Sequence, residues 1–554
     1  MKAKMRLLPY ALIFSLPLSF CLVAGWQLEH TDHVTPGLPG VAFFLLSALL
    51  LTPVSLFLLS WKPRKPLFFL HPVPPADKKA GRRMFLLTWA AIALLNLIVL
   101  LGVYPGFFVY DAQDELTEVL SRTFNTHHPL LHVLALGGTV TGIHKITGDW
   151  NLGIFIYLLL QMLLITGIFA LVIRRLADSG LPKPLRITAI LWYGVFPTIV
   201  MGTLCSSKDG LFTAFTTLFF LELVEQRHSR RRSITLLVSC SAMMLFRNNA
   251  RYALLVFALC LLVFWGISQI RRAGKADTKD GRAGSSAPLF LISIVIISFV
   301  ILSLTNTLLI RATHATSNEH QESIPVVIQT LARAWHDHPE AFSDEDREAL
   351  ISYLGEEGLE RYELRNADLV KMYFNNGRYE TDSGSFWALW FRILRRCPDS
   401  YLNGWFLLSY PMWYPFAVNN VYEGHTVFTF TYTESSYFGY ETELPGTRQS
   451  LIPPIDALYR WLSLDATIQR IPVLSLFFAP AFYFWLYLFL ALRLLAQKRS
   501  GDAFPLLPIL LLWLTYLIGP AAVVRYALLL WTILPIVLTG FIPSEEQTES
   551  GICH

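Results

Sequence analysis

Long apolar runs separated by short polar loops constrain the fold of this chain more than any other feature. A helix needs about 20 apolar residues to cross the hydrocarbon core of a bilayer, and many segments of this chain reach that length. Only 15% of the residues are charged and 54% are hydrophobic, whereas soluble domains carry about a quarter charged residues. The sequence therefore predicts an all-α polytopic membrane protein.

The apolar runs predict about 12 transmembrane helices. The predicted spans are 7–25, 39–60, 84–103, 151–173, 187–205, 209–225, 233–247, 251–270, 288–310, 470–495, 504–521 and 525–542. Cytoplasmic loops carry an excess of Lys and Arg, and with the N-terminus inside, every short basic loop of this chain falls on the same side. This alternation predicts that both termini are cytoplasmic.

Two large segments remain on the outer side. The first is 104–150, and the second is 311–469, which is long enough for a domain of its own between helices 9 and 10. In the second, a capping-type start predicts a helix over 343–364, aromatic and basic residues at 385–416 suit an amphipathic interfacial helix, and alternation predicts a strand over 425–435. We therefore expect a mixed α/β extracytoplasmic domain. The other divisions are 1–83 with two spans and a basic loop, 84–310 with the membrane core, and 470–554 with the last spans and a short tail.

Acidic residues gather at the membrane boundary in the stretch Tyr104–His132. They are Asp111, Asp114, Glu115 and Glu118. Acidic groups beside a bilayer are costly unless they face water or a partner, so this cluster indicates a site. Asp114, Glu115 and Glu118 could instead form a solvated helix face, which is the preferred interpretation for Glu118.

Two histidines follow the acids in the same stretch. His127 and His128 could bind a metal ion together with Asp111. The adjacent Pro129 favours a structural role instead, because proline is common in the first turn of a helix.

Basic and polar residues occupy the predicted outer ends of several other spans. They are Lys208, Asp209, Arg247, Asn248, Arg251, Arg311, Arg525 and Tyr526. Lys and Arg neutralise a phosphate group through charge-assisted hydrogen bonds, and a nearby carboxylate can deprotonate a hydroxyl group. The combination predicts a site for a lipid-linked phosphate. Each basic side chain could instead extend to lipid headgroups, an alternative that stays open for Arg251 and Arg311 above all.

A series of motifs resembles a bacterial family of polytopic membrane proteins of unknown function. The motifs are, in order, YPGFFVYD, HHP, SSKDGLFTAF, FRNNARYA, ESIPVVIQTLAR, CPDSYLNGWF, YPMWYP and GPAAVVRYALLLWTILP. They cover roughly residues 100–540. The chain departs from the family at Val327-Ile328, before Gln329, where a second glutamine is usual. That family in turn resembles the GT-C glycosyltransferases, which have many spans, an acidic residue in an early outer loop and a large extracytoplasmic part.

The GT-C resemblance implies a location and an activity. It implies a membrane enzyme of the bacterial inner membrane that transfers a sugar from a polyprenyl-phosphate carrier to an extracytoplasmic acceptor. The acceptor could be an envelope polymer, a lipid or a protein. The implied partners are this sugar donor and membrane lipids, with no nucleic acid, cofactor or metal.

The same resemblance assigns roles to individual residues. The base of the superfamily corresponds to Asp111, with Asp114 and Glu115 as further candidates, although the usual early loop follows the first span and this one follows the third. The predicted phosphate-binding residues are Lys208, Arg247, Asn248, Arg251 and Arg525. The secondary candidates are His128, Asp209, Glu322, Gln329 and Tyr526.

Two other functions compete with this interpretation. A transporter or lipid flippase could line its pathway with the same charges, but inverted repeats and charges near the middle of the membrane would be expected. The sequence shows neither. A non-catalytic envelope assembly protein would tolerate the loss of Asp111.

Overall fold

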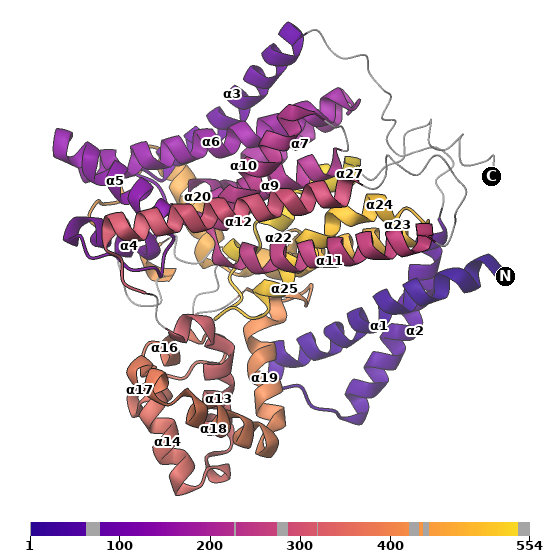
Figure 1. Cartoon of the computed structure of the whole chain (residues 1–554), viewed down its shortest axis with the longest axis vertical. Helices are drawn as coiled ribbons and strands as arrows, with labels where there is room; N and C mark the ends of the chain where they lie inside the picture. Colours follow the sequence, from indigo (N-terminus) through magenta and orange to yellow (C-terminus); the bar gives the residue numbers. More distant parts are fainter. Residues whose placement is uncertain are drawn as a thin grey trace.

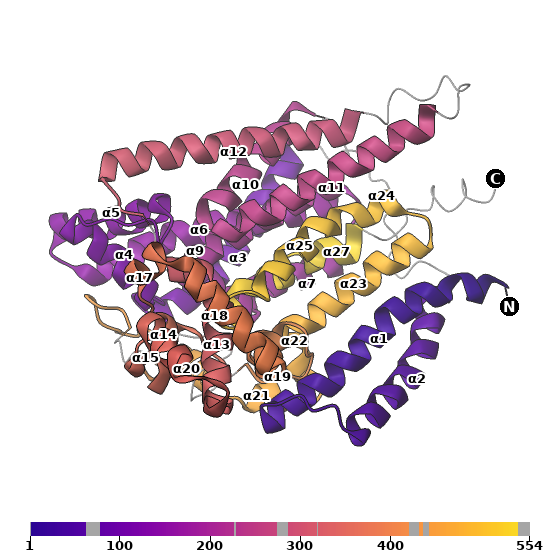
Figure 2. The same ribbon diagram turned by 60° about the horizontal axis from the view of Figure 1, so that its bottom comes forward.

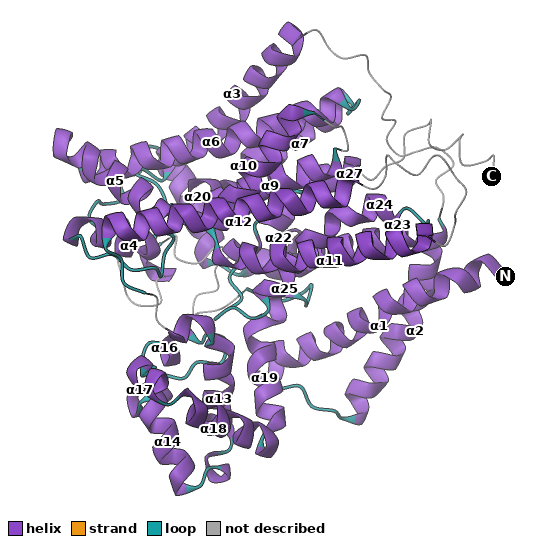
Figure 3. Cartoon of the chain, viewed as in Figure 1, coloured by secondary structure: helices purple, strands orange, loops and turns teal. Residues whose placement is uncertain are grey.

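A computed structural model describes residues 2–61, 78–225, 229–273, 286–317, 320–419, 432–435 and 442–540. Within these ranges all regular secondary structure is helical (Figure 3), and only isolated β-bridges join extended residues. The prediction of an all-α fold is therefore confirmed for the described residues. The segments lie in one bundle of long helices with a group of shorter helices beneath it (Figure 1).

The long apolar helices form the bundle. They are α1 (Lys2–Thr31), α2 (Leu38–Ser60), α3 (Lys78–Gly102), α6 (Trp150–Asp178), α11 (Asn248–Ala273) and α12 (Ser286–Thr313). Each contains a stretch long and apolar enough to cross a membrane. The helices α1 and α2 form a hairpin at one side of the bundle, next to α23 (Pro480–Ala496), as Figure 2 shows. The chain is therefore a multi-pass membrane protein.

The predicted count of 12 spans is not supported by helix length. Among the described residues six helices are long enough, or seven if α7 (Lys183–Val195) and α8 (Pro197–Leu204), which meet at 52°, form one broken span. The other predicted spans are shorter helices. They are α9 (Lys208–Val224), α10 (Arg230–Phe246), α23, α25 (Leu507–Tyr516), α26 (Leu529–Thr532) and α27 (Leu534–Gly540).

Proline explains two of these breaks. Pro197 begins α8 after α7, and Pro480 begins α23 directly after the short helix α22 (Leu474–Phe478). Proline has no backbone N–H and its ring clashes with the preceding turn, so a helix ends before it and a new one starts. Counting apolar residues alone cannot detect such an interruption.

A helical domain occupies most of the large insertion. Its helices are α13 (Pro325–Asp337), α14 (Asp344–Leu354), α15 (Glu356–Glu360), α16 (Asp368–Lys371), α17 (Asn376–Thr381), α18 (Ser383–Arg396) and α19 (Pro398–Ser409). The prediction of a mixed α/β domain is therefore not supported. Of the predicted strand over 425–435, residues 425–431 lie outside the described part of the chain, and Thr433–Ser435 form a 3₁₀ turn.

Two local signals of this domain appear in the structure, although the predicted helix over 343–364 is divided at Gly355 into α14 and α15. Ser343 and Asp346 form the two reciprocal hydrogen bonds of a capping box at the start of α14. The amphipathic helix α18 is also present, but its apolar face is covered by the domain itself, with Phe386 and Ile393 fully buried. The opposite face pairs with α14, because Arg392 donates to Asp346 at 2.8 Å. The apolar face of α18 is therefore not free to lie on a membrane.

The helical domain is attached to the bundle at several points. The end of α19 enters the bundle core, where Leu407 and Tyr410 are buried against the spans. Arg365 donates to Asp32 at the end of α1 at 2.7 Å. These contacts fix the domain at one end of the bundle, below it in Figure 1.

The two ends of the bundle differ in charge. Arg174 of α6 packs against Gly81 near the start of α3, and Arg231 at the start of α10 lines the same pocket. The helices α3 and α10 then run from this basic end to the stretch that begins at Tyr104 and to Arg247. A helix of 17 residues such as α10 spans about 25 Å, so the two ends are well separated.

Candidate functional site

The stretch that leads to Asp111 passes through the protein core before it reaches the acid. Phe107 is fully buried, forms a parallel bridge with Cys205 and accepts a hydrogen bond from the Ser206 N–H at 2.9 Å. The helix α4 (Tyr110–Ser121) begins directly afterwards. Asp111, in its first turn, is thereby held beside the start of α9.

The start of α9 supplies Lys208 and Asp209. A Cβ atom added to Gly210 would lie 2.5 Å from the Gly202 carbonyl oxygen, so only glycine allows α9 to approach α8 this closely. Asp209 lies in the first helical turn, where a carboxylate is favoured by the partial positive charge of the helix N-terminus. The close approach keeps both charged residues against the segment that carries Asp111.

Two arginines arrive from distant parts of the chain. Arg247 caps the end of α10, and Arg525 lies in a 3₁₀ turn (Val524–Ala527). The loop before this turn is held by the helical domain, because the Ala367 N–H donates to the Pro520 carbonyl at 2.9 Å. The domain in the insertion therefore helps to place Arg525.

These residues form one ion-pair network. Arg525 Nη1 donates to Asp111 Oδ2 at 2.9 Å, and Lys208 Nζ lies 3.7 Å from the same oxygen. Asp209 binds Arg247 through Oδ1, and its Oδ2 lies 3.7 Å from Arg525 Nε. We refer to Asp111, Lys208, Asp209, Arg247 and Arg525 as the Asp111 cluster.

Three cations and two carboxylates thus share the Asp111 cluster. Their side chains are between 2% and 16% exposed, so bulk water screens the charges only weakly. The cluster carries one positive charge in excess, which suits an anionic ligand. Tyr526 covers one side, with its ring centroid 4.4 Å from Arg247 Cζ.

A second set of buried polar groups begins at Lys208. Lys208 Nζ lies 2.8 Å from His128 Nδ1, and Glu115 Oε1 lies 3.8 Å from that nitrogen. The other oxygen of Glu115 lies 2.5 Å from His132 Nδ1. Glu115 and His132 are at most 1% exposed.

The set continues into α6. Tyr157 Oη lies 2.9 Å from His132 Nε2 and donates to Gln161 at 3.1 Å. Gln161 in turn donates to the carbonyl groups of Thr203 and Cys205. We refer to the series His128, Glu115, His132, Tyr157 and Gln161 as the polar chain, and it links Asp111's surroundings to the broken helix pair α7–α8.

The acids of α4 have contrasting pKa values. Burial raises the pKa of Asp111, but the charges of Arg525 and Lys208 outweigh it and hold that pKa well below its usual range. Partial burial and the neighbouring carboxylates of Asp111 and Glu115 raise the pKa of Asp114 to about 6. Burial likewise raises the pKa of Glu118 to about 7.

His128 is expected to be neutral. Burial, followed by the charge of Lys208, lowers the pKa of His128 well below its usual value. A neutral imidazole can accept a hydrogen bond from the Lys208 ammonium group, as the 2.8 Å distance requires. His128 is therefore a partner of the lysine in this structure.

The structure brings together most of the predicted site residues. Asp111, Lys208, Arg247, Arg525, Asp209 and Tyr526 share the Asp111 cluster or line it, and Glu115 and His128 lie in the adjacent polar chain. Asp114 lies on the exposed side of α4.

Four predicted site residues lie apart from the Asp111 cluster. Asn248 is exposed, and Arg251 contacts Tyr252, with a 3.2 Å hydrogen bond. Glu322, in the 3₁₀ turn before α13, accepts a hydrogen bond from Lys371 at 2.8 Å and lies 3.8 Å from His127 Nδ1, and Gln329 donates to the Glu363 carbonyl within the helical domain. These contacts give Glu322 and Gln329 roles in the structure of that domain.

Sequence reasoning missed three members of the polar chain: His132, Tyr157 and Gln161. Tyr157 and Gln161 are four residues apart in α6, a spacing that places both on one face of the helix, and this signal could have drawn attention to them. His128 lies in the bend before α5 (Leu130–Thr147), so His132 has no such partner in its helix. Within the described residues, no three His, Cys, Asp or Glu side chains are grouped to hold a metal ion.

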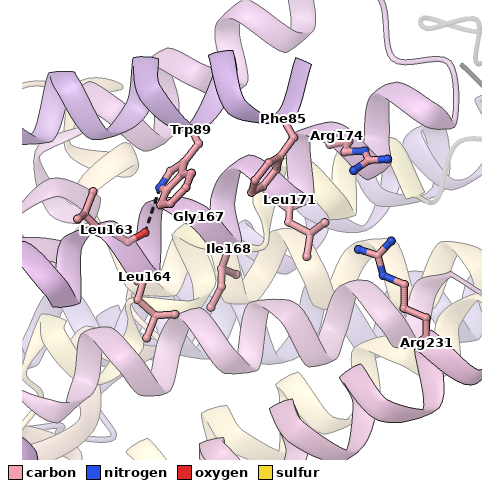
Figure 4. Close-up of a pocket in the computed structure, with 9 residues that line it drawn as sticks. All are labelled: Phe85, Trp89, Leu163, Leu164, Gly167, Ile168, Leu171, Arg174 and Arg231. Carbon is pink, nitrogen blue, oxygen red and sulfur yellow. Dashed lines mark hydrogen bonds between the residues drawn. The ribbon is translucent and has the colours of Figure 1, made fainter. Parts of the chain in front are cut away.

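Two cavities of the protein lie away from Asp111. One has a volume of about 650 Å³ and lies between α20 (Pro453–Leu464) and Arg470. The other, about 340 Å³, lies at the basic end of the bundle and is lined by α3, α6 and Arg231 (Figure 4). The Asp111 cluster is therefore a candidate site because of its buried charges and not because it lines either cavity.

The fold defines the chain as a multi-pass α-helical membrane protein with a helical domain inserted beside a buried ion cluster. A family of unknown function (DUF6020) matches residues 119–551. Because this match covers most of the chain, the protein belongs to that family. No curated protein and no solved structure matches the chain.

Proposed function

We propose that the protein is a GT-C-type glycosyltransferase that moves a sugar from a polyprenyl-phosphate carrier to an extracytoplasmic acceptor. The observation that carries the proposal is the Asp111 cluster, in which Lys208, Arg247 and Arg525 converge with two carboxylates at the ends of apolar helices. Buried cations beside a bilayer are costly and are retained where they bind a substrate or a partner. A lipid-linked phosphate is an anion that would reach this depth.

The phosphate would replace Asp111 as the partner of the basic residues. Arg525 and Lys208 both contact Asp111 Oδ2, and a phosphate oxygen entering between them would form stronger charge-assisted hydrogen bonds with both. Loss of these cations as partners would raise the pKa of Asp111 from its low value in this structure. Binding of the donor would thus convert Asp111 from an ion-pair partner into a base.

In the chemical step, an acceptor hydroxyl oxygen attacks the anomeric carbon of the donor sugar. The bond from that carbon to the phosphate oxygen breaks, and the polyprenyl phosphate leaves with the electron pair. Asp111 takes the hydroxyl proton, and Lys208, Arg247 and Arg525 stabilise the charge that develops on the phosphate. Asp114 lies one helical turn further along and is an alternative base, with a pKa of about 6.

We also propose that the shorter helices complete 12 crossings and that the basic end faces the cytoplasm of a bacterial cell. The separation of the basic ends of α3 and α10 from the Asp111 cluster supports this orientation. Both termini would then be cytoplasmic, and the helical domain and the Asp111 cluster would lie on the outer side. A cysteine introduced at the exposed Asp344 should react with an impermeant reagent in intact cells. Labelling only after cell lysis would contradict the orientation.

One observation favours a second candidate function, a proton-coupled transporter or flippase. The polar chain from His128 to Gln161 consists of buried titratable and polar groups in contact, as proton pathways in transporters do. A transporter would move a lipid or an envelope precursor without breaking a covalent bond. Product analysis separates the two candidates.

The test is transfer of radiolabelled sugar by the purified full-length protein in lipid vesicles. Mixed polyprenyl-phosphate sugars serve as donors and envelope extracts as acceptors. We expect labelled product with the wild type, a loss of at least about 100-fold with Asp111→Asn, and wild-type rates with the control Asp344→Asn. Full activity of Asp111→Asn would remove Asp111 from the mechanism. Absence of transfer from every donor would contradict the enzyme proposal.

A further inference from the structure

A groove at the basic end of the bundle combines an apolar floor with two guanidinium groups. The floor is one face of α6, where Leu164, Ile168 and Leu171 follow one another at helical spacing. Phe85 and Trp89 of α3 form a wall. Figure 4 shows these side chains along the groove and the guanidinium groups of Arg174 and Arg231 together at its other end.

The walls of the groove are fixed by specific contacts. The Trp89 indole N–H donates to the Leu163 carbonyl at 3.0 Å, and the indole lies against Gly167, where an added Cβ atom would be 3.5 Å away. Arg174 Nη2 would lie 3.1 Å from a Cβ atom at Gly81. A small residue at position 81 thus lets Arg174 lie against α3 at the end of the groove.

The two arginines retain unused capacity for an anion. Arg231 forms no ion pair within 4.0 Å with a described carboxylate, although its charge acts on Glu222 from further away, and Arg174 reaches Asp178 only at 3.8 Å through Nε. The Arg174 Nε atom is buried and has no hydrogen-bond partner in the described part of the chain. Buried unsatisfied donors are costly, and an anion between the two guanidinium groups would satisfy them.

The length of the groove matches one leaflet. From Leu163 to Arg174 the helix rises about 16 Å, and half of the hydrocarbon core of a bilayer is about 15 Å. A lipid chain on the α6 floor would therefore place its phosphate beside the arginines. Basic pockets between transmembrane helices are a known form of site for anionic lipid headgroups.

We propose that this groove binds an anionic glycerophospholipid, with one acyl chain against α6 and α3 and its phosphate between Arg174 and Arg231. The site lies at the opposite end of the bundle from the Asp111 cluster and does not depend on the proposed transferase activity. Its occupant would be a structural or regulatory lipid that ties α3 and α10 to α6.

The test uses the purified full-length protein in neutral detergent and phosphatidylglycerol with a photoreactive diazirine in one acyl chain. After illumination, labelled peptides are identified by mass spectrometry. We expect labels in 85–89 and 163–171, with phosphatidylcholine of the same chain labelling these peptides far less. The double variant Arg174→Gln/Arg231→Gln should reduce labelling roughly 30-fold, since each arginine near an anionic headgroup contributes about fivefold.

Two further variants separate loss of the site from loss of folding. Leu171→Trp would fill the groove without a change of charge and should abolish the labels, whereas Leu160→Trp, on an exposed part of α6, should not. The charge control Arg83→Gln/Arg230→Gln should label like the wild type. Equal labelling by phosphatidylcholine, full labelling of Leu171→Trp or of the Arg174/Arg231 variant, or displacement by an equal amount of polyprenyl phosphate would overturn the proposal.

Discussion

Substitution of Asp111 and Arg525, singly and together, should show that their contributions to the free energy of unfolding are strongly coupled. At 2.9 Å and an effective dielectric constant of 20, the Coulomb attraction is roughly 6 kcal/mol. Most of it is offset by the cost of removing both charges from water. The coupling between contacting residues is typically about 0.5–3 kcal/mol, and the upper half of that range is expected here because Arg525 is only 7% exposed.

The single variants should differ from the double variant because of the charge balance. Asp111→Asn leaves three cations with one carboxylate, and Arg525→Gln leaves two cations with two carboxylates that have lost a shared partner. The double variant restores the original excess of one positive charge. Breaking one side of a buried pair costs roughly 3–5 kcal/mol, and the low end applies to Arg525→Gln because Lys208 and Arg247 remain.

The assay is the free energy of unfolding of the purified protein in mixed micelles, measured for the wild type, both single variants and the double variant. The double variant should be more stable, by about 2–3 kcal/mol, than the summed destabilisation of the two single variants predicts. The pair Arg525→Gln and Asp344→Asn serves as a control and should be additive. Additivity of Asp111→Asn and Arg525→Gln within about 0.5 kcal/mol would refute the ion-pair geometry.

Three further results are expected. His132→Phe should lower stability by about 3 kcal/mol because it leaves the buried Glu115 carboxylate without its 2.5 Å partner, and the added change Glu115→Gln should recover part of the loss in thermal unfolding. Lys371→Met should increase protease cleavage of the helical domain, since Glu322 and Asp368 would lose the cation they share at 2.8 and 2.9 Å, while Lys145→Met should not. The pKa of Glu118 is raised to about 7 from an ordinary 4.5, so between these pH values the folded protein binds a proton that the unfolded chain does not. The free energy of unfolding therefore falls as pH rises from about 4.5 to 7. Glu118→Gln should flatten this slope. Unchanged melting of His132→Phe, unchanged cleavage of Lys371→Met, or the same pH slope in Glu118→Gln would contradict the corresponding contact.

The convergence of the charged residues could be predicted from the sequence because charge is rare in this chain. Lys208, Arg247 and Arg525 interrupt apolar runs, and the alternation of basic loops assigns them to one end. Their proximity then follows from the topology, because helix ends on the same side of a bundle lie near one another. The same argument failed for Asn248 and Arg251, because a residue at a helix end can point toward the lipid as well as inward.

Other features depend on tertiary structure. Glu322 and Gln329 belong to motifs of the resemblance, but their partners Lys371 and the Glu363 carbonyl are known only once the helical domain is folded. The predicted spans 187–205 and 470–495 are interrupted at Pro197 and Pro480, where the apolar run continues but the helix breaks. His132 escaped notice because a single histidine in an apolar helix has no distinctive pattern until its carboxylate partner on α4 is in place.

Binding of polyprenyl phosphate and of the corresponding polyprenol to the purified full-length protein tests the central claim most directly. The claim is that the Asp111 cluster binds a lipid-linked phosphate through Lys208 and Arg525. Two charge-assisted hydrogen bonds contribute about 3 kcal/mol or more, so the phosphate should bind at least about 100-fold more tightly than the alcohol. In Lys208→Gln/Arg525→Gln this preference should disappear, and it should persist in Arg83→Gln/Arg230→Gln. Equal affinity for both lipids in the wild type, or an undiminished preference in the Lys208/Arg525 variant, would contradict the account.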